Sequence, residues 1–197
     1  VTNLATDDQV ETVTIAGAAT DAGTYSGKLV PSNAKIVNAA GEDVTAGYEI
    51  EYKAGTLTIA KRPVTLTSES ATKPYDGKAL TKDTVTVSGD GFVEGQGATY
   101  SVTGSQTKVG SSDNTFTYTL NEGTNAENYN ITKTEGTLTV TKRGATGEKV
   151  TITATDNTAT YDGKPHGENG YTVTNLATDD QVETVTIAGA ATDAGTY

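Results

Sequence analysis

The chain contains no cysteine, no methionine and no tryptophan among its 197 residues. Without cysteine, disulfide bonds and thiol chemistry are excluded. Only 4 prolines occur, whereas a mucin-like stalk needs abundant proline beside its threonines. No apolar run approaches the roughly 18–20 residues that cross a bilayer, so we expect no membrane insertion in this segment.

Positive charge is also scarce. Lysine and arginine together number 14 against 25 aspartates and glutamates, which gives a formal net charge of −11. Nucleic acids and anionic membrane surfaces are bound through basic faces. We therefore expect neither as a partner, and the acidic excess would keep a long extracellular chain soluble.

Threonine is the most abundant residue, with 40 copies, beside 22 glycines and 10 tyrosines. The threonines alternate with Val, Ile, Leu and Tyr, and a period of two is typical of strands. The sequence therefore predicts mainly β structure with at most a short helical turn. The best position for that turn is Leu4–Val10, with a counterpart at residues 92–94.

Residues 1–25 return, letter for letter, as residues 173–197. Repetition at a fixed period indicates a repeat or array architecture. Within this period, two related modules share landmarks in the same order. The matching segments are residues 64–67 with 150–153, 75–78 with 161–164, 109–110 with 22–23, 129–131 with 48–50, and 136–143 with 55–62.

These matches divide the chain into three parts. Residues 63–143 form a complete module, residues 1–62 the C-terminal part of a first module that lacks its first strand, and residues 144–197 the N-terminal part of the next copy. Small modules are marginal alone, so neighbouring repeats are the expected partners in an elongated array. Because the two split parts are complementary, one molecule could complete another head to tail.

Apolar stripes place the strands of the complete module. The stripes are Val64/Leu66, Val85/Val87, Tyr100/Val102, Phe116/Tyr118/Leu120, Tyr129/Ile131 and Leu138/Val140. We expect tight hairpin turns at Glu135-Gly136 and at Ala54-Gly55, where glycine would supply a positive φ. The topology stays open between a β-grasp-like module and an immunoglobulin-like β-sandwich.

Four motifs of the chain resemble the MBG-type and YDG-type tandem repeats of large bacterial cell-surface adhesins. They are Tyr-Asp-Gly-Lys, the (Ala/Val)-Gly step, Asn-Tyr-Asn-Ile at residues 128–131, and Gly-Thr-Leu-Thr-Val-Thr-Lys-Arg at residues 136–143. The resemblance covers nearly the whole chain, although Tyr48-Glu49-Ile50 departs from the third motif. It implies a cell-wall-anchored or secreted bacterial protein. Some members are described as mucin-binding, but the resemblance supplies no binding residues.

The repeated Tyr-Asp-Gly segments at residues 75–77 and 161–163 are the first candidate site. A sugar-recognition loop would use the tyrosine for stacking. In a structural turn, the aspartate would bond nearby backbone, the glycine would take φ > 0 and the tyrosine would pack on the core. Recurrence at the same place in both modules favours the structural turn.

Two further groups of residues could carry chemistry. His166 is the only histidine and has Leu80 as its counterpart, so we expect neither catalysis nor metal binding there. Carboxylate pairs could bind calcium at a module joint, but the spaced EF-hand pattern is missing. The pairs are Asp7-Asp8, its repeat Asp179-Asp180, Glu42-Asp43, and Asp83 with Asp90.

Lysines could also form covalent crosslinks with side chains, as would suit a load-bearing protein without cysteine. Lys73, Lys133 and Lys149 are the candidates, and Asn130-Ile131-Thr132 is a formal glycosylation sequon without expected use. We predict no catalytic, cofactor-binding or metal residues and no enzyme activity. The chain is expected to be an extracellular spacer, with weak multivalent glycan or mucin binding as the alternative.

Overall fold

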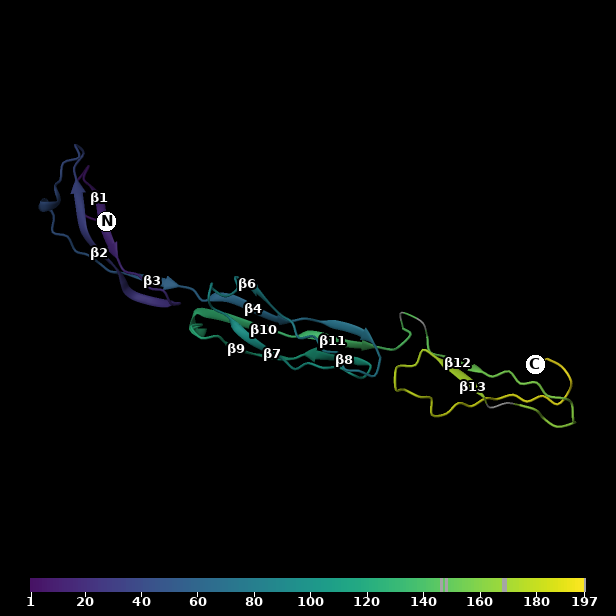
Figure 1. Ribbon diagram of the computed structural model, residues 1–197. Coiled ribbons are helices and arrows are strands. Elements are labelled where there is room, and N and C mark those ends of the chain that lie inside the picture. The colour runs from purple at the N-terminus through teal and green to yellow at the C-terminus, as the bar shows by residue number, and fades with distance from the viewer. Residues whose placement is uncertain (146, 148, 168–169, 197) are drawn as a thin grey trace. The chain divides into compact units, whose positions relative to one another are not determined.

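The computed structural model describes residues 1–145, 147, 149–167 and 170–196, and these form small separate sheets of two or three strands (Figure 1). The mainly β prediction is confirmed. The strands are β1 (Gln9–Ala16), β2 (Gly23–Val37), β3 (Gly55–Ile59), β4 (Arg62–Ser68), β5 (Ala71–Pro74), β6 (Val85–Gly89), β7 (Ala98–Val102), β8 (Gly110–Asn114), β9 (Phe116–Leu120), β10 (Tyr129–Thr134), β11 (Gly136–Thr141), β12 (Thr151–Ala154) and β13 (Tyr171–Thr174).

Backbone contacts group the chain into two compact units. One consists of Val1–Thr65, Val87–Ala98 and Leu120–Thr132, and the other of Leu66–Thr86, Thr99–Thr119 and Lys133–Tyr197. The division into modules at residues 62 and 143 describes the sequence repeat and stays a prediction.

The first unit contains the three-stranded sheet β1-β2-β3. Strand β1 pairs antiparallel with the far half of β2, from Gln9↔Val37 to Ala16↔Val30. Strand β3 pairs with the near half of β2 through Gly23↔Ile59 and Tyr25↔Leu57. The long strand β2 therefore holds both neighbours along its length.

Two tyrosines of the first unit, Tyr48 and Tyr129, each hold a distant loop through hydrogen bonds of the hydroxyl group. Each follows a 3-10 turn, η1 (Thr45–Gly47) before Tyr48 and η2 (Ala126–Asn128) before Tyr129. The Tyr48 hydroxyl accepts a hydrogen bond from the Ala5 amide at 3.0 Å and donates to the Asp8 carboxylate. The sequence match of these tyrosines thus extends to their contacts.

The helical turn expected at Leu4–Val10 is absent, and so is its counterpart at residues 92–94. In both places a tyrosine hydroxyl fixes the loop: the Tyr129 hydroxyl accepts from the Val93 amide at 3.1 Å and donates to Gln96. Asp8 is thereby occupied as an acceptor for Tyr48 instead of capping a helix start. No described helix has the length and apolar character needed to cross a membrane.

The second unit is built around β11, which pairs parallel with β5 and antiparallel with β8. Strand β12 pairs with β13 in a sheet of two strands, and β7 with β9 in another. In a further sheet of three strands, β4 lies between β10 and β6, and these strands are not confined to the second unit. The apolar stripes predict the core in part: five of their thirteen members are at most 1% exposed, whereas Val87 is 42% exposed. The five least exposed members are Val64, Leu66, Phe116, Leu138 and Val140.

The two predicted hairpins are wrong. Strands β10 and β11 follow each other directly but belong to different sheets, so Glu135 carries the chain from one sheet to the next. Gly136 has no positive φ; an added Cβ would lie 2.7 Å from the Glu69 carbonyl carbon and closer still to the Ser68 oxygen. Glycine is needed here for close backbone approach. At Gly55, β3 pairs with β2 and not with the preceding residues.

A buried polar cluster, formed by Ser68, Asn114 and the Gly136 amide, lies where these strands change sheets. The Ser68 hydroxyl donates to the Asn114 carbonyl at 2.6 Å and accepts from the Gly136 amide at 2.9 Å. The Asn114 side-chain amide donates to the carbonyls of Glu69 and Lys82, each at 2.8 Å. Both side chains are at most 1% exposed, and both form hydrogen bonds with the backbone, as most buried polar side chains do.

Candidate functional site

The carboxylate of Asp76 organises the first Tyr-Asp-Gly-Lys segment. Its Oδ1 atom accepts hydrogen bonds from the Lys78 amide at 3.0 Å and from the Lys73 ammonium at 2.7 Å. Gly77 has a φ of 80°, which glycine adopts without strain. Tyr75 packs against the buried core cluster of Leu80, Leu138 and Val140. The segment is an Asx turn with its aromatic ring on the core.

The second segment repeats the turn with one change of partner. Asp162 Oδ1 accepts from the Lys164 amide at 3.0 Å, and Gly163 has a φ of 79°. His166 Nε2 lies 2.7 Å from the same Asp162 oxygen, the role that Lys73 has in the first turn. Tyr161 is 65% exposed, so this copy lacks the core contact of its counterpart.

Replacing Lys73 with methionine should raise the pKa of Asp76 toward its usual value of 3.8. The Lys73 hydrogen bond is the largest cause that holds the pKa of Asp76 below that value, ahead of the Lys78 amide. Because the folded-state pKa is lowered, the ionised carboxylate stabilises the fold above the ordinary pKa, and this contribution is lost as the pH falls through the folded-state pKa. An NMR titration of the Asp76 carboxyl carbon measures the change. Lys108→Met is the control, and an unmoved Asp76 titration in K73M would contradict the assignment.

His166 occupies the backbone position of Leu80. It exchanges hydrogen bonds of 3.0 and 3.1 Å with Ala191, as Leu80 does at 2.8 and 3.1 Å with Gln106. Its ring contacts Asp162 four residues earlier. The histidine thus stands at a matched structural position, where sequence comparison of the two modules already placed it.

Several members of the carboxylate pairs have polar partners, some local and some distant in sequence. Glu42 accepts from the Asn38 side-chain amide at 2.9 Å, and Asp43 from the Thr45 amide at 3.0 Å. Asp180 lies 3.5 Å from the Tyr75 hydroxyl. Among the described residues, no group of three or more His, Cys, Asp and Glu side chains is placed to hold a metal ion. A calcium ion at a module joint stays a prediction from sequence.

Lys73 and Lys133 contact carboxylates through their ammonium groups, whereas Lys149 accepts a hydrogen bond through its backbone carbonyl. The Lys133 ammonium lies 2.5 Å from Glu135 and 4.8 Å from the centroid of the Phe116 ring. The Lys149 carbonyl accepts from the Asn175 side-chain amide at 3.1 Å. Covalent crosslinks at Lys73, Lys133 and Lys149 stay a prediction.

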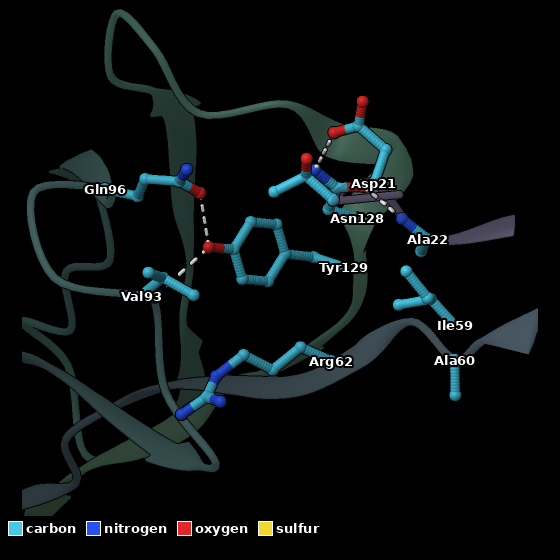
Figure 2. Close-up of a pocket in the computed structure, with 10 residues that line it drawn as sticks. Asp21, Ala22, Ile59, Ala60, Arg62, Val93, Gln96, Asn128 and Tyr129 are labelled. Carbon is cyan, nitrogen blue, oxygen red and sulfur yellow. Dashed lines mark hydrogen bonds between the residues drawn. The ribbon is translucent and has the colours of Figure 1, made fainter. Parts of the chain in front are cut away.

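A cavity of about 310 Å³ lies within the first unit (Figure 2). Its walls combine residues from before the predicted boundary at residue 62, such as Asp21 and Ile59, with residues from after it, such as Asn128 and Tyr129. The Asn128 side chain accepts from the Ala22 amide at 2.7 Å and donates to Asp21 at 2.8 Å. Figure 2 shows the Asn128 side-chain amide and the Tyr129 hydroxyl pointing toward their hydrogen-bond partners.

The polar groups of this cavity hold its walls together. Arg62 donates from Nε to the Gly91 carbonyl at 2.7 Å and from a terminal nitrogen to the Asp90 carbonyl. Beside the cavity, Lys61 forms an ion pair of 3.1 Å with Glu127. These contacts join segments far apart in the sequence, and so sequence patterns could not reveal them. They are hydrogen bonds and an ion pair.

Arg143 has a related contact in the second unit. Its Nε atom donates to the Asn175 carbonyl, and a terminal nitrogen lies 3.4 Å from the Tyr75 carbonyl. Arg62 and Arg143 are the matching last residues of the two Lys-Arg segments. In the sequence, only the matching positions of Arg62 and Arg143 at the predicted module boundaries pointed to these contacts.

No protein-family model, curated protein or solved structure matches the chain.

Proposed function

We propose that the chain is a spacer segment of a bacterial surface adhesin or extracellular fibre, in which tandem β modules project a distal binding domain. The observation that carries the proposal is the exact return of residues 1–25 as residues 173–197. A single catalytic or binding site gives no reason for such a repeat. In an array, copy number sets the reach of the chain. The adhesin family and the cell-surface location in this proposal rest on the resemblance of the motifs to those of adhesin repeats.

Matching strand registers support two modules of one design. Strands β2 and β3 pair through Gly23↔Ile59, Thr24↔Thr58 and Tyr25↔Leu57. Strands β8 and β11 pair through Gly110↔Val140, Ser111↔Thr139 and Ser112↔Leu138, which are the same positions in the aligned modules. Strands that pass from one sheet to another also occur at the corners of sandwiches, so we favour the sandwich-like topology over the β-grasp.

Continuity at the predicted boundary supports a load-bearing role. Strand β3 ends at Ile59 and β4 begins at Arg62, so two residues separate the last strand of one module from the first strand of the next. Pro63 restricts the backbone there. A short, restricted joint transmits force without the slack of a flexible linker.

Weak multivalent binding to glycans or mucin is the second candidate function, because Tyr52 and Tyr161 are 41% and 65% exposed. Repetition would multiply a weak affinity for each module. The chain, coupled in many copies to beads, is tested on a glycan and mucin array beside a double variant, Tyr52→Ser with Tyr161→Ser. The spacer role predicts equal signals for both proteins at every coupling density. A signal that rises with density and falls in the double variant would replace it with the binding role.

A further inference from the structure

Two loops of the complete module, residues 90–96 and 125–128, contact segments that come before this module in the chain. Arg62 donates to two backbone carbonyls of the first loop. Asn128 of the second loop is hydrogen-bonded to the Asp21-Ala22 step. All of these residues belong to the first compact unit. The two loops together are called the joint face below.

Tyr129 and a local turn fix the positions of the contacting groups on the joint face. The Tyr129 hydroxyl accepts from the Val93 amide at 3.1 Å, and its ring meets the Phe92 ring edge on, with the centroids 5.1 Å apart. Tyr129 itself is 4% exposed. In the second loop, the Asn125 side chain accepts from the Glu127 amide at 3.0 Å and caps the short turn η2. A buried anchor and a capped turn therefore preorganise the face.

Asn128 uses both polar atoms of its side chain on the preceding segment (Figure 2). Its oxygen accepts from the Ala22 amide at 2.7 Å, and its nitrogen donates to the Asp21 carboxylate at 2.8 Å. The side chain is partly buried. This two-bond contact requires a partner that presents an acceptor side chain directly before a backbone amide.

Only one of the two modules presents such a partner. The step before the matched strand is Asp21-Ala22 in the module that ends at Arg62, and Lys108-Val109 in the module that ends at Arg143. An ammonium group donates hydrogen bonds and accepts none, so a lysine at this step cannot accept from the Asn128 nitrogen. The two modules thus differ in the group that Asn128 contacts.

The corresponding face of the other module differs as well. The residue before Tyr129 is Asn128, whereas the residue before its counterpart Tyr48 is Gly47. Glycine has no side chain with which to form the two-bond contact. The arginines at the ends of both modules, by contrast, donate to backbone carbonyls, which every residue supplies. The arginine contact is therefore common to both joints, and the Asn128 contact belongs to one of them.

We propose that the joint face of the complete module is an interface that selects its preceding neighbour, and that Asn128 makes the selection through Asp21. The arginine contact holds a preceding module of either kind. The Asn128 contact adds specificity, because a lysine ammonium against the amide nitrogen penalises the wrong neighbour. In an array, this interface fixes the order in which the two modules alternate. It takes the predicted division into two modules as its basis and is independent of whether the array acts as a spacer or binds glycans.

Spin-label distances across the joint test the selection, because the chain has no native cysteine that would be labelled as well. The labels are attached at Thr12→Cys in β1 and at Glu122→Cys, two exposed positions of the first unit. Asp21→Lys introduces the residue of the other module. We expect it to widen the distance distribution at least about twofold, as a joint that loses its contacts moves toward the behaviour of a flexible linker. Asp193→Lys makes the same change in the repeated copy, within the other unit, and should leave the distribution unchanged.

An exchange of the two side chains separates recognition from general destabilisation. Asn128→Asp alone places two carboxylates against each other and should widen the distribution as Asp21→Lys does. Asp21→Asn combined with Asn128→Asp again pairs one amide with one carboxylate, and the Ala22 amide keeps an acceptor, so the wild-type distribution should return. An Asp21→Lys protein with the wild-type distribution, or a double variant as wide as N128D, would overturn the proposal.

Discussion

Gly136→Ala should lower the free energy of unfolding by about 3 kcal/mol or more, the upper range for overpacking a close contact. The new Cβ would meet backbone atoms of Ser68 and Glu69, with the Glu69 oxygen at 2.8 Å. Backbone that takes part in two sheets cannot give way as a flexible side chain does. Urea unfolding followed by circular dichroism measures the effect.

Gly97→Ala is the matched control for this substitution. Gly97 also has no positive φ, but an added Cβ would meet only the end of the Asn121 side chain, at 3.3 Å. We expect a change of less than about 1 kcal/mol, since that side chain can move. Equal losses in the two variants would show that the close approach at Gly136 does not limit stability.

Asn114→Ala should cost about 2–4 kcal/mol of unfolding free energy, because unsatisfied buried groups and cavities each destabilise by amounts of this order. The substitution leaves the carbonyls of Glu69 and Lys82 without the side-chain donor that each has at 2.8 Å. It also opens a void at a position that is 0% exposed. The same urea unfolding experiment measures the loss.

Two further variants separate these causes. Asn114→Asp keeps the size of the side chain but replaces the donor by an acceptor, so it should be at least as unstable as N114A at neutral pH. Asn130→Ala changes an exposed residue of β10 and should alter stability by less than about 0.5 kcal/mol. A stable N114D protein would mean that donation to the two carbonyls contributes little.

The alternation of apolar residues predicted six of the eight strands from β4 to β11 and part of their core, but it missed β5 and β8. Val64, Leu66, Phe116, Leu138 and Val140 were all placed on core-facing stripes, and all are buried. This succeeds because the period of side chains along a strand is a local property of the sequence.

Strand partners were not predictable in the same way. The sequence suggested that β10 and β11 form a hairpin, whereas they lie in different sheets. Pairing depends on segments such as β5 and β11, which are separated by more than 60 residues, and alternation carries no information about that choice. The glycine that begins β11, Gly136, was recognised as special, but close approach and positive φ give the same sequence signal.

In the candidate sites, too, local contacts were predictable from the sequence and long-range contacts were not. Asp76 and Gly77 could be assigned to a turn because their contacts are local. The contacts of Tyr48, Tyr129 and Arg62 were missed, because each joins loops 28 or more residues apart. Only the recurrence of these residues in both modules marked them, and recurrence does not identify a partner.

Amide hydrogen exchange in the two identical segments tests the central claim most directly, namely that the partner strand decides the structure of each copy. Segmental isotope labelling separates residues 9–16, which form β1, from their copies, residues 181–188, which form no described strand, in NMR spectra of the dilute 197-residue chain. We predict protection at least about 100-fold greater in residues 9–16, where β1 pairs with β2. Equal protection of the two segments in dilute monomeric protein would contradict the account.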